Sequence, residues 1–396
     1  MMDFYQGQET LLQQTVRVVD SETVTLNQAA GRILAQTLIA TADAPAFDNS
    51  AMDGYAVCGL DCTEWQLIGT AAAGDSRQQT LQHGQAMRIY TGAGIPLQTD
   101  AVIMQEKTSV NGNILTSTHT VNTGENIRRQ GEELKQGTVL LPEGALLTPQ
   151  AIGLAASQGA SELPVYRKLR VSVFTTGDEL VSGNYKLEQH QIYDSNRPML
   201  LACLRQYAFI EVIDGGILPD TLDIITDTLA RAAADSDSII ISGGASVGDR
   251  DLVKPALQQL GTIEHWKLAI KPGKPFGWGT IDLCRVMLLP GNPVASFVTF
   301  KLMGLPALQT AAGRPIQQSL PACYQAKAAF SIAPNHQKRR EFLRGTLCFT
   351  KNGPEVQLLD KQGSHMLSSC VNAQVLIDIP PQTDIHQGQW LTVHPI

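Results

Sequence analysis

Residues 237 to 254 read Asp237-Ser-Ile-Ile-Ile-Ser-Gly-Gly-Ala-Ser-Val-Gly-Asp-Arg-Asp-Leu-Val-Lys254, and this order of residue types predicts a strand, a loop and a helix. The unbroken β-branched run from Ile239 to Ile241 is typical of a strand covered on both faces, as in a parallel sheet between layers of helices. Gly243 and Gly244 then remove side chains where the strand ends, and a helix is expected at 251–260. Ligands of open α/β sheets bind beyond the carboxyl ends of the strands, so this loop is a candidate site.

The loop suits an anion bound together with a hard cation. Free backbone N–H groups and a helix N-terminus favour an anion, and Asp249 and Asp251 add carboxylates of the kind that hold a divalent metal. A phosphate with its metal ion is therefore the first hypothesis for the ligand. The alternative is a glycine-rich turn with solvated acids, and this stretch alone does not decide between the two.

The composition is that of a globular protein with several domains. A chain of 396 residues with 43% hydrophobic and 17% charged residues predicts roughly two to four domains and little extended disorder. The net charge of -7 argues against general nucleic-acid binding, so we expect no nucleic-acid partner and a strictly local anion site.

The cysteine pattern and the N-terminal sequence indicate the cellular compartment in which we expect the protein. The seven cysteines include no C-x-x-C pair, which is typical of a reducing compartment and indicates neither a disulfide framework nor a zinc site. Cys58 and Cys62 have no matching second pair, so they are interpreted as small residues without a special role. The chain begins without a signal-peptide pattern and contains no run of about 18 apolar residues. We therefore expect a cytoplasmic protein outside the membrane.

The N-terminal part predicts a scaffold that is interrupted by a small β domain. Apolar residues at helix spacing favour helices within 4–45, including a second amphipathic helix at 29–38. Thr148-Pro149 is a cap followed by a first-position proline, and it opens a helix that runs to Ser157. The intervening segment contains short predicted strands bounded by turn residues, at 85–90, 101–105 and 114–116. The expected domains are an elongated scaffold at 1–45 and 138–168 and an inserted small β domain at 46–137.

From residue 169 the pattern changes to alternating strands and helices, which predicts a central α/β domain with a mostly parallel sheet. Its expected strands are 169–174, 209–213, 237–242, near 263–270 and 285–289, and its helices are 196–206, 221–234, 251–260 and 293–311. Beyond Pro315 further strands are expected, at 324–332, 341–349, 355–359, 374–379 and 389–393. The α/β domain is expected at 169–315, followed at 316–396 by a compact β barrel or sandwich.

The loops that follow the α/β strands carry charges of both signs. Because parallel strands present the same ends to one edge of a sheet, these loops should lie together. Acids and lysines in this set fit an anionic ligand bound with a divalent cation. The set comprises Asp178, Glu179, Asp220, Asp249, Asp251, Lys271 and Lys274. The loop from Pro290 to Pro293 is stiffened by two prolines and adds a further wall.

Three loops of the inserted β domain contain polar residues that could bind a ligand. Asp53 lies among small polar residues in a loop that could face a ligand, and Thr91 offers a hydroxyl on a flexible backbone. Arg128 and Arg129 stand beside Glu132 and Glu133, and paired guanidinium groups suit an oxyanion. An Asx turn at Asp53 and a surface ion-pair cluster at the arginines remain open as alternatives.

These motifs occur in one order along nearly the whole chain. They are 47–56, 91–93, 101–106, 126–129, 176–180, 242–248, 271–275 and 290–293, continued by 339–342 and 363–365. A Ser-Gly-Gly motif alone would be weak evidence for any family. The ordered set resembles the molybdopterin molybdenumtransferase family, whose relatives include the C-terminal domain of gephyrin.

The resemblance implies a fold, a reaction and partners. It implies an α/β multidomain chain with a molybdopterin-binding central domain, an elongated N-terminal scaffold with its inserted β domain, and a C-terminal β barrel. It also implies a homodimer with a site shared between subunits. Molybdate and adenylylated molybdopterin would react in the presence of Mg2+ with release of AMP, and a molybdopterin adenylyltransferase would be a candidate partner. The alternatives are a non-catalytic molybdopterin-binding scaffold and an adenylyltransferase.

The resemblance also implies roles for particular residues. The residues carried over as catalytic are Asp53, Thr91, Glu179, Asp220 and Asp251, of which Glu179, Asp220 and Asp251 are the expected metal ligands. The residues carried over as substrate-binding are Arg129, Glu133, Asp178, Ser195, Gly243, Gly244, Ser246, Gly248, Lys271, Lys274, Pro290, Asn292, Pro293 and Ser364.

The chain departs from the family pattern in two places. Glu133 stands where the family commonly has an Asp and is one methylene longer. The segment from Leu218 to Thr221 keeps the single acid Asp220, where the family often has two. Both departures affect the expected metal geometry.

Overall fold

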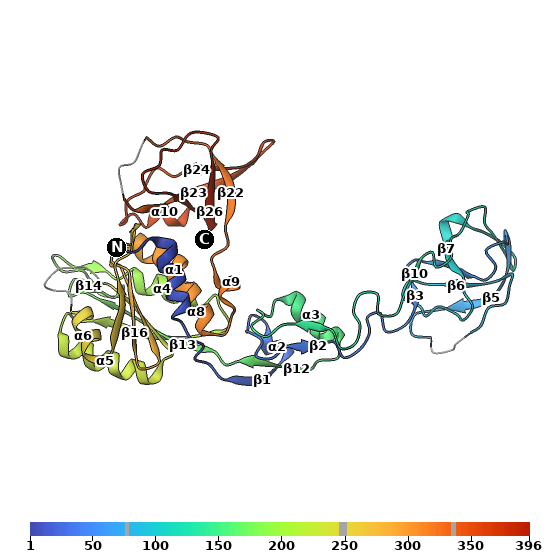
Figure 1. The fold of residues 1–396 in the computed structure, drawn as a ribbon, viewed down its shortest axis with the longest axis horizontal. Helices are drawn as coiled ribbons and strands as arrows, with labels where there is room; N and C mark the ends of the chain where they lie inside the picture. Colours follow the sequence, from blue (N-terminus) through green and yellow to red (C-terminus); the bar gives the residue numbers. More distant parts are fainter. Residues whose placement is uncertain (76–78, 245–251, 334–337) are drawn as a thin grey trace. The chain divides into compact units, whose positions relative to one another are not determined.

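The computed structural model describes residues 1–75, 79–244, 252–333 and 338–396 (Figure 1). The chain forms two compact units. The larger unit comprises Met1–Gln36, Glu143–Ile152 and Ser161–Ile396, and the smaller unit comprises Thr37–Pro142 and Gly153–Ala160. None of the helices in the described part of the chain has the length and apolar composition that a bilayer crossing requires.

The central sheet of the larger unit is mostly parallel. Its strand order is β16 (Ile210–Leu218), β13 (Leu169–Thr176), β17 (Ser238–Ser242), β21 (Cys284–Leu289), β20 (Gly277–Ile281) and β18 (Thr262–Trp266). The strands from β16 to β21 are parallel, and β20 and β18 join as antiparallel strands at one edge. The predicted α/β fold is therefore confirmed, although β20 was not predicted.

Both faces of this sheet are covered by helices, as the isoleucine run of β17 predicts. Ile240 packs into one buried cluster, while Ile239 and Ile241 pack into another on the opposite face. The first cluster includes residues of α4 (Asn196–Leu204), α7 (Pro293–Thr299) and α8 (Leu305–Ala311). The second includes residues of α5 (Leu222–Asp235) and α6 (Val253–Leu260), which lie on the same side of the sheet in Figure 1. Each fully buried isoleucine contributes about 1.5–3 kcal/mol to folding.

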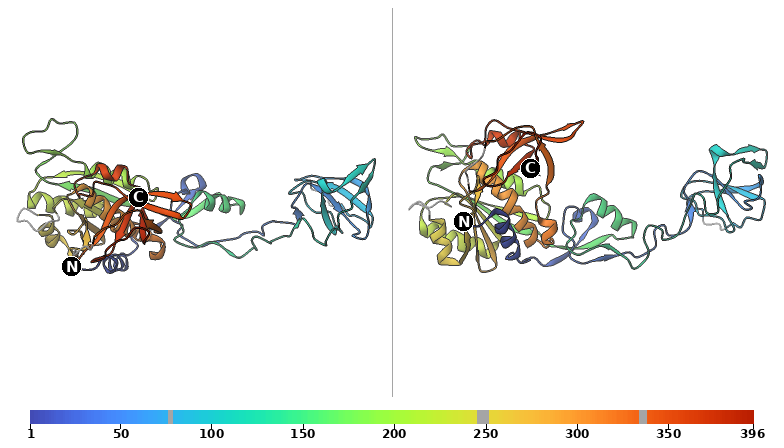
Figure 2. Two further views of the ribbon diagram at one scale, coloured as in Figure 1. Left: turned by 90° about the horizontal axis from the view of Figure 1, so that it is seen from above. Right: turned by 45° about the horizontal axis from the view of Figure 1, so that its top comes forward.

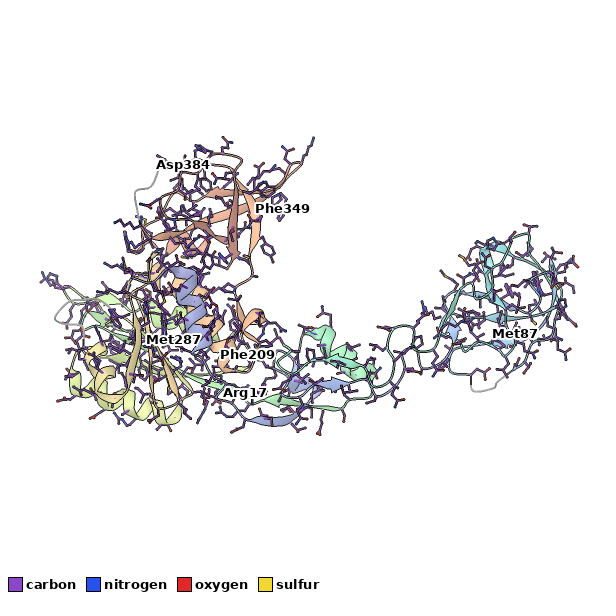
Figure 3. The ribbon with its side chains drawn as sticks, viewed as in Figure 1. Arg17, Met87, Phe209, Met287, Phe349 and Asp384 are labelled. Atoms are coloured by element: carbon purple, nitrogen blue, oxygen red, sulfur yellow. The ribbon has the colours of Figure 1, made fainter. Side chains whose placement is uncertain are left out.

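The last predicted helix of the α/β domain forms as one continuous segment. Between α7 and α8 the chain keeps a helical course through a wider turn at Phe300–Gly304. Val298, Leu302 and Leu305 from this segment are buried in the same cluster as Met287 of β21, which is labelled in Figure 3. The segment thereby fixes the end of β21, where the 290–293 loop begins.

The C-terminal region is a closed barrel. Its strands pair in the cyclic order β23 (Arg340–Thr350), β24 (Gly353–Leu358), β22 (Tyr324–Ala328), β26 (Trp390–Pro395) and β25 (Val375–Ile379), and β25 pairs again with β23. Val356, Ile377 and Val393 lie in its buried core. Two short helices, α9 (Ile316–Ser319) and α10 (Ser368–Val371), flank it. Of the two architectures that the strand pattern allows, the structure has the barrel.

One strand links the barrel to the α/β sheet. The segment expected as a strand near 263–270 ends early as β18, because the chain turns at Lys267, which has a φ of 74°. The next residues form β19 (Ile270–Lys271), which pairs in parallel with β23 of the barrel. Lys271 and the loop after it are therefore held beside the start of β23.

The N-terminal segment of the larger unit contains one substantial helix, α1 (Phe4–Gln13), and a strand pair of β1 (Ser21–Thr25) with β12 (Glu162–Tyr166). The prediction of a second helix at 29–38 is wrong. The short α2 (Leu26–Ala29) stops before Gly31, which has a φ of 73°. Ile33 and Leu34 instead form bridges to Leu146 and Val165, so strand-type neighbours bury these apolar residues. The helix predicted after Thr148 is present as α3 (Pro149–Ser157).

The smaller unit contains the small β domain (Figure 2). Its main sheet has the order β7 (Ala101–Met104), β4 (Gly54–Val57), β6 (Gln85–Ile89), β5 (Glu64–Ala71), β9 (Ile114–Thr116) and β8 (Ser109–Asn111). A short 3-10 turn, Gln105–Lys107, follows β7. Two shorter pairs accompany this sheet, namely β3 (Asn49–Ser50) with β10 (Ile127–Arg128) and β2 (Leu38–Ile39) with β11 (Val139–Leu141). The expected inserted β fold is confirmed.

Candidate active site

A cleft of about 1200 Å³ lies in the larger unit beyond the carboxyl ends of the parallel strands. Its walls come from the loops that follow β13, β16, β17 and β21, from the loop after β19, and from the C-terminal barrel. Of the residues expected at the site, those lining this cleft are Glu179, Ser195, Asp220, Gly243, Gly244, Lys271, Lys274, Pro290, Asn292, Pro293 and Ser364. The structure thus brings together loops that span most of the α/β domain.

The glycine pair at the end of β17 allows its loop to pack against β13. Gly243 and Gly244 have φ values of 100° and 60°, in the left-handed region that favours glycine. A Cβ atom on Gly243 would lie 2.4 Å from the carbonyl oxygen of Thr176, and one on Gly244 would lie 2.3 Å from Cγ2 of Val253. Any side chain at these positions would therefore displace the loop from the wall of the cleft.

Asp220 is held in place by the loop that follows β13. Its Oδ1 accepts a hydrogen bond of 2.6 Å from the Thr176 hydroxyl, and its backbone N–H donates to Asp178 Oδ1 at 3.0 Å. Asp178 does not line the cleft among the described residues, so its hydrogen bond positions the backbone of Asp220. Glu179 lines the cleft next to Gly177, where a Cβ atom would lie 2.7 Å from the Glu179 carboxylate.

The cations of the cleft come from two domains. Lys271 Nζ lies 2.9 Å from Oε1 of Glu341, and the Glu341 side chain is the more buried partner, at 14% exposure against 39%. Lys274 and Arg339 also line the cleft. These groups place positive charge in the same cleft as Glu179 and Asp220, which is the mixed pattern that the strand-end loops predict.

A buried hydrogen-bond network forms the floor of the cleft. Asn196 Nδ2 donates to Ser242 Oγ at 2.9 Å and to the carbonyl oxygen of Gly291 at 2.7 Å. Ser242 Oγ in turn donates to the carbonyl oxygen of Pro290 at 3.0 Å. The network joins the end of β17 to the proline-bounded loop. Asn196 was not predicted as a site residue, although it follows directly after the expected Ser195.

Asp194 lines the same part of the cleft, but its charge is neutralised locally. Its side chain is 1% exposed, and its Oδ2 accepts hydrogen bonds from Arg197 Nε at 3.0 Å and from the Thr175 hydroxyl at 2.9 Å. Arg197 also pairs with Asp214. Burial opposes the shift, but the hydrogen bonds that Arg197 donates to the Asp214 and Asp194 carboxylates raise its pKa. Asp194 therefore orders the loop before α4, and its charge is paired within the protein.

The barrel contributes more of the cleft than the sequence predicts. Beside Ser364, the lining includes Arg339, Glu341, Gln362 and His365. The carbonyl oxygen of Ser364 accepts a hydrogen bond of 3.0 Å from the Val294 N–H in the first turn of α7. The signal for Arg339, Glu341 and His365 was present, because 339–342 and 363–365 belong to the ordered motif set, whereas Gln362 lies outside it.

The expected site residues of the smaller unit form local contacts. The backbone N–H and the hydroxyl of Thr91 donate to Asp53 Oδ1 at 2.8 and 2.7 Å, and these bonds lower the pKa of the exposed Asp53 carboxyl. Arg129 Nη1 lies 2.6 Å from Asp48 Oδ2, as in a surface ion pair. Glu133 is exposed, and its backbone N–H donates a hydrogen bond to the carbonyl oxygen of Ala44.

Four residues of the glycine loop that were expected to contribute to the site lie outside the described residues. They are Ser246, Gly248, Asp249 and Asp251.

The known families that match the chain cover its domains in sequence. The models are described as MoeA N-terminal region (domain I and II) for residues 2–159, probable molybdopterin binding domain for residues 172–310, and MoeA C-terminal region (domain IV) for residues 325–396. The α/β domain is thus of the molybdopterin-binding class.

Relatives that match over the full length of the chain identify its family within this class. The chain is 38% identical to a molybdopterin molybdenumtransferase of Haemophilus influenzae, over 100% of this chain and 98% of the relative. It is 34% identical to molybdopterin molybdenumtransferase 2 of Mycobacterium tuberculosis, over 98% of each chain. The crystal structure of the molybdopterin biosynthesis moeA protein from Pyrococcus horikoshii OT3 superimposes with a TM-score of 0.84 at 28% identity, covering 100% of both chains. The chain belongs to the molybdopterin molybdenumtransferase family.

Proposed function

We propose that this chain inserts molybdenum from molybdate into adenylylated molybdopterin and releases AMP, in molybdenum cofactor biosynthesis. The observation that carries the proposal is the joining of Glu179 and Asp220 with Lys271 and Lys274 in one cleft beyond the strand ends. Family membership and full-length similarity to two molybdopterin molybdenumtransferases support the same reaction.

The size and charge of the cleft suit these substrates. A cleft of about 1200 Å³ exceeds the volume of about 300–1,000 Å³ that is usual for small-molecule pockets, so it has room for a pterin joined to a nucleotide. The pyrophosphate, the dithiolate and molybdate are all anions. Lys271 and Lys274 would attract the oxyanion, and the Glu341 carboxylate holds the Lys271 ammonium group in an ion pair of 2.9 Å.

We propose that Mg2+ takes part, held by Glu179 and Asp220 together with Asp251. Carboxylate oxygens are the donors that Mg2+ prefers, and Glu179 and Asp220 both line the cleft. When bound, the ion supplies positive charge at the pyrophosphate oxygens. The Thr176 hydroxyl donates to one oxygen of Asp220 and so limits the rotation of the carboxylate that would hold the ion.

The contribution of the protein to the reaction is chiefly electrostatic. Cleavage of the P–O–P linkage leaves negative charge on the departing AMP, and fixed cations of the cleft stabilise that charge more in the transition state than in the bound substrate. Lys271 and Lys274 are the groups proposed for this role. The Asn196 network fixes the proline-bounded loop against the end of β17, so this wall of the cleft does not have to reorganise during the reaction.

We further propose that the protein is a cytoplasmic homodimer in which Asp53, Thr91, Arg129 and Glu133 from one subunit complete the cleft of the other. The ordered Asp53 carboxylate supports a role for this surface, because two hydrogen bonds from Thr91 fix it although it is exposed. A molybdopterin adenylyltransferase would supply the substrate and is the proposed protein partner.

The test is AMP release from adenylylated molybdopterin by the purified protein, with molybdate and Mg2+ present or omitted. Release that requires both is the expected result. Consumption of ATP to form the adenylylated pterin would instead indicate an adenylyltransferase. Binding without cleavage would indicate a non-catalytic molybdopterin-binding scaffold.

A further inference from the structure

Three side chains of the types that bind metals lie close together in the small β domain of the smaller unit. His83 Nε2 lies 2.8 Å from Asp61 Oδ1 and 3.9 Å from Cys62 Sγ. One donor atom from each of the three residues lies within 4.8 Å of the other two. We propose that Asp61, Cys62 and His83 bind a zinc ion, a site independent of the molybdenum chemistry.

The sheet brings the three residues together across a gap in the sequence. Asp61 and Cys62 lie in the turn after β4, and His83 lies in the loop before β6, on which Figure 3 labels Met87. β4 and β6 are antiparallel neighbours, and the ladder continues past their ends. Cys58 N–H donates to the carbonyl oxygen of Gln85 at 3.0 Å, and Gly84 N–H donates to that of Cys58 at 2.9 Å. The two donor loops are thereby fixed at the same end of the sheet.

The turn that carries the thiol is anchored at Gly59. Its N–H donates to Asp100 Oδ2 at 2.7 Å, and its carbonyl oxygen accepts a hydrogen bond of 3.1 Å from the indole of the buried Trp65. Gly59 has a φ of 98°, and a Cβ atom there would lie 3.0 Å from both Cys62 Sγ and the His83 ring. A glycine at this position therefore leaves the space in which the thiol and the imidazole approach each other.

The arrangement differs from that of a nucleophilic triad. In a triad the carboxylate and the nucleophile contact opposite nitrogens of the imidazole ring. Here the carboxylate and the thiol both face Nε2 of His83. Three donors that converge on one region suit a shared ion, whereas proton relay from Cys62 through the ring to Asp61 would require the second nitrogen.

The donor set favours zinc over the hard cations. A thiolate, an imidazole and a carboxylate are its usual ligands, with water in the fourth tetrahedral position, whereas Mg2+ and Ca2+ prefer oxygen donors throughout. Zinc bond lengths place tetrahedral sulfur and nitrogen ligands about 3.5 Å apart, and nitrogen and oxygen ligands about 3.4 Å apart. The observed 3.9 Å between Cys62 and His83 would have to shorten, and the observed 2.8 Å between His83 and Asp61 would have to lengthen, each by about 0.5 Å. The side chains of His83 and Asp61 are 66% and 77% exposed, so an ion can reach them from solvent.

The ion would join two loops of the small β domain. Because zinc would bind the folded arrangement and not the separated loops, it would stabilise the domain by mass action. The interpretation of Cys62 as a small residue without a special role rested on the missing second cysteine pair. The partner is instead a histidine 21 residues further along the chain.

The experiment titrates metal-free full-length protein with Zn2+ against a chromogenic chelator, with Co2+ as a spectroscopic probe. One equivalent of Zn2+ should bind per chain at this site, and Cys62→Ser and His83→Ala should each weaken its binding at least tenfold. The Co2+ form should show a sulfur-to-cobalt charge-transfer band that Cys62→Ser abolishes. Asp61→Asn retains the shape of its side chain and should weaken binding less than the loss of either of the other ligands.

Two control variants match these changes elsewhere in the chain. His386 Nε2 lies 2.9 Å from Asp384 Oδ2 on the barrel, an exposed imidazole–carboxylate pair that is not part of a three-donor group among the described residues. Cys348 is an exposed thiol on β23. His386→Ala and Cys348→Ser should leave Zn2+ affinity and the cobalt band unchanged. The proposal is overturned if the wild type does not compete with the chelator, if Cys62→Ser and His83→Ala retain wild-type affinity, or if the control variants lose binding equally.

Discussion

The cleft of the larger unit and the Asp53 surface of the smaller unit both carry expected site residues, but they are held in different ways. In the cleft, Asp220 and Lys271 depend on loops far apart in the sequence and on partly buried contacts with Thr176 and Glu341. On the Asp53 surface, the carboxylate is exposed and depends on Thr91 alone among the described hydrogen bonds. Substitutions in and beneath the cleft should therefore affect both catalysis and stability, whereas those on the Asp53 surface should affect catalysis alone.

The largest expected effect is on catalysis by the cleft. Asp220→Ala removes a proposed metal ligand, and AMP release should fall about 10²–10³-fold, as for the loss of one preorganised transition-state contact. Asp223→Ala, an exposed acid in the first turn of α5, is the matched control and should retain wild-type turnover. Single-turnover assays measure both, and equal activity of Asp220→Ala and wild type would remove Asp220 from the site.

The second effect is on stability at the amino end of β17, at the opposite edge of the sheet from the cleft. Burial alone would raise the pKa of Asp237, but the hydrogen bonds from the Arg167 guanidinium and the Arg170 N–H hold it below its usual value. Asp237→Asn should lower the free energy of unfolding by about 3 kcal/mol at neutral pH, because it leaves a partly buried guanidinium without its charge partner.

The depressed pKa also fixes the pH dependence. A carboxyl group with a lowered folded-state pKa contributes stability that is fully present above the unfolded pKa of about 3.9 and is lost as the pH falls toward the folded pKa. Urea unfolding of wild type and Asp237→Asn should therefore give curves that converge in acid below about pH 4. Asp48→Asn in the smaller unit, where the carboxylate is 37% exposed, should cost less than about 1 kcal/mol.

The third effect concerns the glycine turn. Gly243→Ala combines a φ of 100° with a Cβ atom 2.4 Å from the Thr176 carbonyl oxygen, so it should destabilise the protein by about 2 kcal/mol and lower AMP release. Gly153→Ala is the control, because Gly153 lies in α3 with no atom within 4 Å of its Cβ position. It should raise stability by about 0.5–1 kcal/mol. Thermal unfolding distinguishes the two, and equal stability of wild type and Gly243→Ala would contradict the packing argument.

The smallest effect tests the Asp53 surface. Thr91→Val removes the hydroxyl that donates to Asp53, and AMP release should fall roughly tenfold, as for the loss of one hydrogen bond to a charged group. Thr91→Ser keeps the hydroxyl and should retain activity, while the melting temperature should be the same for both variants. A lower melting temperature for Thr91→Val would show that the bond supports folding, which would weaken the contrast with the cleft.

The sequence predicts the framework of the cleft because its signals are local. The Ile239 to Ile241 run specifies a strand covered on both faces, and polar residues directly after each strand must then meet at one sheet edge. The glycine pair likewise indicates close packing from its residue type alone. Glu179, Asp220 and the two lysines follow from these rules without knowledge of tertiary contacts.

The remaining features depend on long-range pairing that no local pattern contains. The pairing of β19 with β23 brings Glu341 to Lys271 from 70 residues away, and the closure of β4 against β6 brings His83 to Cys62. The wrong prediction of a helix at 29–38 has the same cause. Ile33 and Leu34 are apolar because they are buried by strand-type bridges to distant residues, which helix periodicity does not reveal. Periodicity reports that a residue is buried, but the partner that buries it is set by the fold.

The most direct test of the proposed reaction measures AMP formation and molybdenum bound to the pterin in the same sample. Purified protein with adenylylated molybdopterin, molybdate and Mg2+ should give equal amounts of both products, and neither should form in significant amount with Asp220→Ala. AMP release without incorporated molybdenum would indicate a hydrolase acting on the nucleotide linkage. That result would contradict metal transfer as the function of the cleft.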